Sequence, residues 1–283
     1  MRIPKYWAHG TYTFKDEEDT AFTSSCWRWS DQSMDEARQL ADDKAKEIAI
    51  KLANQEQLNR YDYGRNPLRE EIVQSIKNSQ GSEIGLVTRN LYGALVLNAS
   101  NAMFIDIDFP EKGASLAGAV GKLFGSKPPP DPAQAYIQRV EQWSAQNPDW
   151  GIRLYRTFGG LRGLITNGVF DPTQESSLNI LRGLQSDSLY IKLCRAQESF
   201  RARLTPKPWR CDIGRPPARW PFENAGQEQR YRQWQAGYER AASKYTVCRL
   251  IKQIGKDETH PDIAPILAAH DEMACATGNL NLA

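Results

Sequence analysis

Residues 102–110, with the sequence AMFIDIDFP, form an apolar run that contains two aspartates and ends at a proline. Side chains alternate between the two faces of a β-strand, so Asp106 and Asp108 are expected to point the same way. Ile105 and Ile107 then point to the opposite side, into a core. Two carboxylates this close raise each other's pKa unless a cation or hydrogen-bond donors lie nearby. The run therefore predicts a core strand with an acidic face that needs a positive partner.

The composition is that of an ordinary globular protein, with 283 residues of which 40% are hydrophobic and 25% charged. Because the net charge is only +2, a phosphate- or nucleic-acid-binding surface has to be a local patch. The five cysteines form no C-x-x-C pair and leave an odd one, which indicates neither a zinc site nor a disulfide framework. No apolar segment approaches the length of a membrane span. These features predict a cytoplasmic protein with reduced thiols and no membrane partner.

Residues 1–80 are predicted to form an N-terminal ββα region packed on the core. Residues 5–29 alternate aromatic or β-branched residues with polar ones around a charged turn, which is typical of a β-hairpin. Ser33 and Glu36 form a capping box, and apolar residues then recur at helical spacing to about residue 53. A separate small docking domain is the alternative. A short helix is expected over residues 68–78.

Residues 81–222 are predicted to form an α+β core. Residues 84–89 and 92–98 are typical of two strands, and the acidic strand follows directly. Short connections favour an antiparallel meander, which would place the acidic strand centrally in its sheet. Residues 111–132, rich in Gly, Ser, Ala and Pro, predict a mobile loop, and Asp131-Pro132 is typical of a helix start.

A second hairpin is predicted over residues 152–167, with Gly159-Gly160 as its two-residue turn. Thr157 would then lie opposite Arg162. One face of the hairpin would carry its polar and basic residues, namely Arg153, Tyr155, Thr157, Arg162 and Thr166. A basic face beside an acidic strand suits a metal-bound phosphate ligand, because carboxylates hold the cation while arginine holds phosphate oxygens. The alternative is a solvated hairpin face with an Arg–Asp ion pair.

A basic segment is expected to follow a helix over residues 187–203. Residues 195–219 contain seven Lys or Arg residues against two acidic ones. Prolines favour an extended path, and two tryptophans offer stacking surfaces for bases. The segment is predicted to bind phosphates or single-stranded nucleic acid, unless it only pairs with surface carboxylates. The nucleic-acid-binding candidates are Arg201, Arg203, Lys207, Trp209 and Arg210.

Residues 223–283 are predicted to form a C-terminal helical region. Apolar residues at helical spacing indicate one helix over residues 224–254 and another over residues 262–275. His270 lies on the second helix and is expected to be a surface or packing histidine, because no nucleophile can be assigned to it.

The order of these motifs resembles the palm of archaeo-eukaryotic primase-polymerases, over about residues 84–210. The sequence FIDID at residues 104–108 is similar to the metal-binding motif of that family. The sequence YRTFGGLRGLI at residues 155–165 resembles its Ser-Gly-Gly-x-His motif, which contacts the incoming nucleotide. The family's histidine falls on Arg162 here, and its serine on Thr157 or Phe158. Arginine can bind a triphosphate but cannot act as a neutral hydrogen-bond partner or proton carrier.

The resemblance implies a largely antiparallel, RRM-like palm sheet with helices packed on one face. It implies a metal-dependent nucleotidyltransferase that binds a nucleoside triphosphate and single-stranded DNA or RNA. Asp106 and Asp108 would hold Mg²⁺ or Mn²⁺ and act in catalysis together with Arg162. The nucleotide-binding residues would be Arg153, Thr157, Gly160 and Arg162. Candidates for the family's third carboxylate are Asp171, Asp187 and Glu198.

Other functions stay open on the sequence. The chain as a whole also resembles an uncharacterised bacterial protein family, which implies no function. A non-catalytic nucleic-acid- or partner-binding protein would use the acidic strand only for structure. A sugar-nucleotide glycosyltransferase also uses an Asp-x-Asp metal site, but the absence of a doubly wound N-terminal half argues against it. The sequence leaves the substrate and the oligomeric state open.

Overall fold

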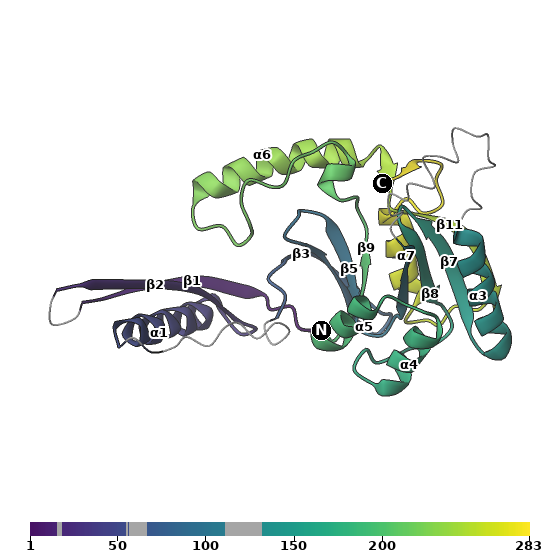
Figure 1. The fold of residues 1–283 in the computed structure, drawn as a ribbon, viewed down its shortest axis with the longest axis horizontal. Coiled ribbons are helices and arrows are strands. Elements are labelled where there is room, and N and C mark those ends of the chain that lie inside the picture. The colour runs from purple at the N-terminus through teal and green to yellow at the C-terminus, as the bar shows by residue number, and fades with distance from the viewer. Residues whose placement is uncertain (16–18, 55, 57–66, 111–131) are drawn as a thin grey trace, which may run out of the picture.

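The computed structural model describes residues 1–15, 19–54, 56, 67–110 and 132–283. Within these ranges the chain forms two four-stranded antiparallel sheets, with a ββα unit projecting from one end (Figure 1). The predicted α+β fold class is confirmed. No described helix is both long enough and apolar enough to cross a membrane. The loop expected over residues 111–132 lies outside the described residues except for Pro132, which begins helix α3.

The projecting unit confirms the predicted hairpin and helix. Strands β1 (Tyr6–Lys15) and β2 (Ala21–Ser30) pair along their whole length, and α1 (Met34–Ala53) packs on them. The Ser33 side chain caps α1 by accepting a hydrogen bond from the Glu36 amide at 3.1 Å. The helix buries a stripe of small residues against the hairpin, Ala37, Ala41, Ala45 and Ala49. Small side chains here let the helix and hairpin backbones approach closely.

The first sheet has the strand order β3-β4-β5-β9, with bounds Glu71–Lys77, Glu83–Arg89, Leu95–Ala99 and Phe200–Arg203. Two predictions are wrong here. The helix expected over residues 68–78 is strand β3, which the pairing with β4 holds extended. The helix expected over residues 187–203 ends earlier, as α5 (Ser188–Gln197), because Glu198 turns the chain with a φ of 52° before β9 begins. Helix α4 (Glu175–Gly183) precedes α5.

The second sheet has the strand order β11-β7-β8-β6, with bounds Cys248–Gly255, Gly151–Thr157, Gly160–Ile165 and Phe104–Asp108. The acidic strand β6 therefore lies at an edge of its sheet, and the predicted central position is wrong. The meander is also wrong, because the chain passes from the first sheet to the second between β5 and β6. Helix α3 (Pro132–Gln146) connects β6 to β7 and packs beside β7, β8 and β11.

The C-terminal region contributes strands as well as helices. The helix expected over residues 224–254 is shorter than predicted: α6 spans Ala225–Ala242. Strands β10 (Tyr245–Thr246) and β11 lie in the rest of that range. Helix α7 (Ala264–Met273) comes next, and β12 (Asn281–Leu282) pairs with β10. The ring of His270 in α7 contacts Phe104 and Tyr155, so helices lie against both faces of the second sheet rather than one. The two sheets draw strands from all three predicted regions and share one hydrophobic core.

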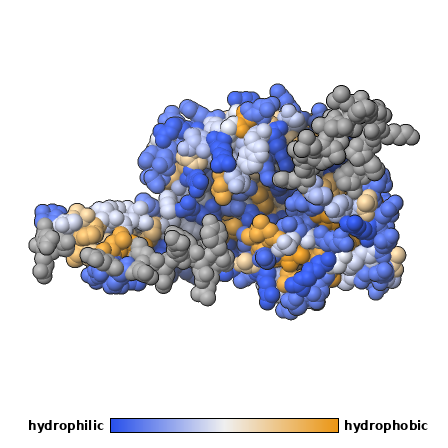
Figure 2. Space-filling view, in the orientation of Figure 1, coloured by the Kyte–Doolittle hydropathy of each residue, from blue (hydrophilic) through white to orange (hydrophobic). Residues whose placement is uncertain are grey.

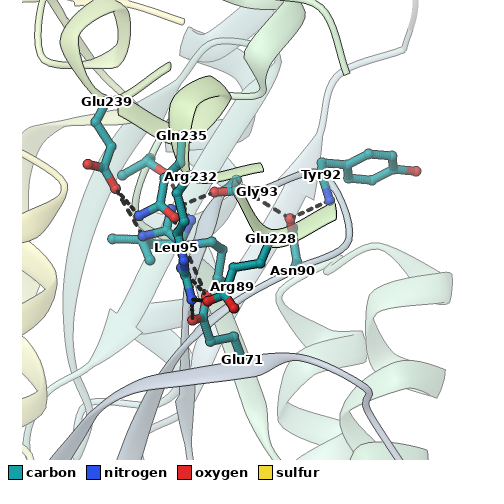
Figure 3. A network of polar contacts seen from close by, with 12 residues as sticks. Glu71, Arg89, Asn90, Tyr92, Gly93, Leu95, Glu228, Arg232, Gln235 and Glu239 are labelled. Carbon is teal, nitrogen blue, oxygen red and sulfur yellow. Dashed lines mark hydrogen bonds and ion pairs between the residues drawn. The ribbon is translucent and has the colours of Figure 1, made fainter. Parts of the chain in front are cut away.

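Helix α6 is fastened to the first sheet by a polar network around Arg89 (Figure 3). The buried Arg89 side chain donates to the Gly93 carbonyl at 2.9 Å and to Glu239 of α6 at 3.0 Å. Its Nε lies 3.6 Å from Glu71 of β3, which also pairs with Arg232 of α6 at 2.7 Å. These ion pairs fix α6 over the sheet.

Candidate functional site

The turn between β7 and β8 lies one residue earlier than predicted. Its two residues are Phe158 and Gly159, so Tyr155, and not Thr157, lies opposite Arg162. Neither glycine of the predicted turn has a positive φ in this structure. Each strand residue pairs two positions away from its expected partner, which leaves every side chain on its predicted face.

The strand pairing places Asp106 directly opposite Arg162, and Asp108 opposite Gly160. Both aspartates line a pocket of about 1000 Å³, while Ile105 and Ile107 on the other face are buried. The predicted alternation of this strand is therefore confirmed. Burial raises the pKa of Asp106, and Asp108 adds to that rise, whereas Arg162 opposes it.

The pocket wall is rich in charge of both signs. It is built from β6, the β7–β8 hairpin, α5, β9 and the short 3₁₀ helix η1 (Pro208–Arg210). The cationic side chains that line it are Arg156, Arg162, Arg203, Lys207 and Arg210. The carboxylates that line it are Asp106, Asp108 and Asp187. Cations outnumber carboxylates, which suits a polyanionic ligand.

Asp187 is the third-carboxylate candidate that the structure brings to the pocket. Its amide donates to the Asp106 carbonyl at 2.7 Å, and its side chain caps α5 by accepting from the Tyr190 amide at 2.8 Å. The other two candidates lie elsewhere, since Asp171 binds Thr173 and Glu198 lies 3.9 Å from Arg2. In the described part of the chain, no three His, Cys, Asp or Glu side chains form a group that could hold a metal ion.

The pocket cations contributed by β9 and η1, namely Arg203, Lys207 and Arg210, repel one another. Burial, together with the positive charges of Arg162 and Arg210, lowers the pKa of Arg203 to about 10. Burial also lowers the pKa of Lys207, with a contribution from Arg203. The Lys207 ammonium lies over the Trp209 ring and the Arg210 guanidinium over the Phe158 ring, at 5.5 and 4.1 Å from the ring centroids. An anion bound between these groups would offset the free-energy cost of burying their charges and would reduce their mutual repulsion.

Several predicted site residues do not reach the pocket. Arg153 forms an ion pair with Asp271 at 2.7 Å. Nη2 of Arg201 donates to both carboxylate oxygens of Glu70, each at 2.8 Å. The ring of Trp209 meets Tyr92 edge-on and does not line the pocket, whereas Thr157 and Arg162 do.

Gly160 does not line the pocket either, but it has a structural role. A Cβ atom on Gly160 would lie 1.9 Å from the carbonyl oxygen of Ile107. The glycine therefore allows β8 to approach β6, and so brings Arg162 beside Asp106.

Hydrophobic side chains also line the pocket. Phe158 of the hairpin turn and Leu189 and Leu193 of α5 line it and are exposed. Figure 2 shows hydrophobic surface at the lower middle of the molecule, where Figure 1 places α5. These side chains suit a planar or apolar group attached to an anion.

The sequence assigned no functional role to His270, which was expected to be a surface or packing histidine. It is fully buried and its Nε2 lies 3.2 Å from the Arg162 guanidinium. Its position four residues after the apolar Ile266, on the helix expected over residues 262–275, was a sequence signal that the imidazole points inward. Asp187 and Arg156 also line the pocket, although the sequence assigned Asp187 only as one of three candidates and Arg156 no role.

No protein-family model, no curated protein and no solved structure matches this chain. The resemblance to primase-polymerases therefore rests on the motifs at residues 104–108 and 155–165 alone.

Proposed function

We propose that the pocket binds a nucleoside triphosphate and carries out metal-dependent nucleotidyl transfer. The observation that carries this proposal is that Asp106, Asp108 and Arg162 line one pocket together with Arg203, Lys207 and Arg210. Carboxylates for a divalent ion and guanidinium groups for phosphates are the parts that such a reaction requires.

The carboxylates fit a divalent cation that the substrate helps to hold. Mg²⁺ is commonly bound by one or two carboxylates together with substrate phosphates, rather than by a complete cage of protein ligands. Asp106 and Asp108 lie two positions apart on one strand face and would hold such an ion, either Mg²⁺ or Mn²⁺. The ion would neutralise charge on the phosphates and the attacking hydroxyl.

The other pocket residues act on the phosphates and the base. Arg162 presents planar donors beside the carboxylates and would bind phosphate oxygens. Arg203, Lys207 and Arg210 would neutralise the remaining phosphate charge, since their own repulsion favours a bound anion. The exposed Phe158 ring would pack against the base.

The test is the melting temperature of the protein with Mn²⁺ and ATP together. Ligand binding to the folded state alone raises the melting temperature. The wild type should show a rise that needs both components, and Asp106→Asn with Asp108→Asn should abolish it. The matched control is Asp42→Asn with Asp43→Asn, two exposed carboxylates on α1, which should keep the full rise. A full rise in the Asp106/Asp108 variant would exclude the metal site.

A non-catalytic nucleic-acid-binding protein is the second candidate. It is favoured by the lack of a three-ligand metal group in the described residues and by the half-exposed Trp209 beside Lys207. Binding of a single-stranded DNA or RNA oligonucleotide should then weaken with salt and survive the Asp106/Asp108 changes. Arg203→Ala with Lys207→Ala and Arg210→Ala should weaken it; equal binding by this triple variant would exclude the basic segment.

Two further proposals concern a third possible activity and the location of the protein. A sugar-nucleotide enzyme would show a larger melting shift with a UDP-sugar than with ATP. A cytoplasmic location fits the five cysteines, all of which are free thiols in this structure.

A further inference from the structure

The imidazole of His270 connects the partly buried carboxylate of Asp271 to the pocket arginine. Its Nδ1 lies 2.9 Å from Oδ1 of Asp271, and its Nε2 lies 3.2 Å from Nη1 of Arg162. Arginine carries donors only, so Nε2 has to accept the hydrogen bond from Arg162. Nδ1 then carries the proton and donates to Asp271. Burial lowers the pKa of His270 to about 4, which keeps the ring neutral and this arrangement intact at neutral pH.

Asp271 is itself held from two other sides. The Tyr155 hydroxyl donates to Asp271 at 2.7 Å, and Arg153 pairs with it at 2.7 Å. Burial alone would raise the pKa of Asp271, but the hydrogen bonds from His270 and Tyr155 lower it below its ordinary value. Asp271 is therefore an ionised, fixed acceptor that orients the imidazole.

The contacts of Arg162 use only one end of its guanidinium. Nη1 donates to the Arg203 carbonyl at 2.8 Å and to His270 at 3.2 Å, and Sγ of Cys248 lies 3.9 Å from the same nitrogen. These contacts use both hydrogens of Nη1. In the described ranges of the chain, Nε and Nη2 of Arg162 make no hydrogen bond, and the residue lines the pocket. Two parallel donors on one planar edge match two oxygens of a phosphate group.

We propose that His270, oriented by Asp271, is a positioning residue that fixes the guanidinium of Arg162 so that its Nε and Nη2 edge binds one phosphate group of the ligand. The identity of the ligand rests on the function proposed above. If His270 only filled the core, the effect of replacing it on ligand affinity would not depend on the presence of Arg162.

The test is a double-mutant cycle on the affinity for inorganic tripolyphosphate, measured by titration calorimetry. His270→Phe removes the acceptor but keeps a ring, and should weaken binding about tenfold, because a hydrogen bond to a charged group contributes roughly that factor. Arg162→Met should weaken binding at least as much. The double variant should bind within about twofold of Arg162→Met, because His270 acts through Arg162. Fully additive losses would overturn the proposal.

Two further variants separate positioning from packing. His270→Gln returns a hydrogen-bond acceptor and should restore most of the affinity lost in His270→Phe. His9→Phe changes an exposed histidine on β1 and should leave the affinity unchanged. A His270→Gln protein that binds as poorly as His270→Phe would show that the ring shape, and not the acceptor, is what matters.

A second measurement does not depend on the ligand. The ¹⁵N resonances of His270 at pH 7 should show a protonated Nδ1 and a bare Nε2. If the wild type binds no tripolyphosphate, the phosphate ligand of the proposed function fails while this tautomer still supports the contact to Arg162. A proton on Nε2 would overturn the positioning role whatever the ligand.

Discussion

Replacing Gly160 by alanine should displace strand β8 from strand β6. The new Cβ would lie 1.9 Å from the Ile107 carbonyl oxygen, whereas ordinary carbon–oxygen contacts are about 3.3 Å or longer. The strands therefore have to separate locally by about 1.4 Å. The contacting atom belongs to the backbone of β6, so no side-chain rotation can relieve the overlap.

The expected cost follows from the contacts that this separation disturbs. Overpacking of a well-packed site costs about 1–3 kcal/mol. The Phe109 amide donates to the Gly159 carbonyl at 2.9 Å beside this position, and losing such a hydrogen bond costs about 1 kcal/mol more. Gly160→Ala should therefore lower the free energy of unfolding by about 2–4 kcal/mol.

The measurement is urea unfolding followed by tryptophan fluorescence, and the control is the neighbouring glycine. A Cβ on Gly159 would meet no atom within 4 Å, and its φ is not positive. Gly159→Ala should therefore change the free energy of unfolding by less than about 1 kcal/mol, and can be stabilising. Equal unfolding midpoints for the two variants would refute the close approach of β8 to β6.

Two further changes test buried charge. In the folded state His270 stays neutral down to about pH 4, whereas in the unfolded chain it is protonated below about pH 6.5. The free energy of unfolding should therefore fall as the pH is lowered between these values, by up to roughly 1.4 kcal/mol per pH unit. Urea midpoints at pH 7, 6 and 5 should show a smaller slope for His270→Gln; equal slopes would contradict the lowered pKa. Arg89→Met removes the buried cation of the network in Figure 3 together with its hydrogen bonds to Gly93 and Glu239, and should cost about 2–3 kcal/mol of unfolding free energy. Arg182→Met, which breaks an exposed pair with Glu175, should cost less than about 0.5 kcal/mol, and similar losses for both arginines would contradict the argument.

Local patterns predicted the elements whose signals lie within a few residues. The capping box at Ser33 placed the start of α1, and the alternation around Asp106 and Asp108 placed both side chains on one face. Strands β3, β9 and β11 were missed because their extended form depends on partners distant in sequence. Residues of β11 continue the helical spacing of α6, yet β11 pairs with β7, about a hundred residues earlier.

The residues of the candidate site likewise fall into those that local motifs predict and those whose partners are distant in sequence. Asp106, Asp108 and Arg162 could be selected because a short motif places each on a known strand face. Arg153 lies on the predicted face of its hairpin, but its partner Asp271 comes from α7, and no local pattern announces that pairing. Arg201 likewise is taken by Glu70, so charge density along the chain overestimated the number of available cations.

The pocket wall is assembled from segments that lie far apart along the chain, from Asp106 in β6 to Arg210 in η1. Bringing such distant segments together costs loop-closure entropy before their contacts stabilise the fold, so these contacts form more slowly than local ones. Affinity for a ligand of this pocket should therefore return only once these distant segments have paired. A mutation in the hydrophobic core between the two sheets could then abolish binding without touching any residue of the wall.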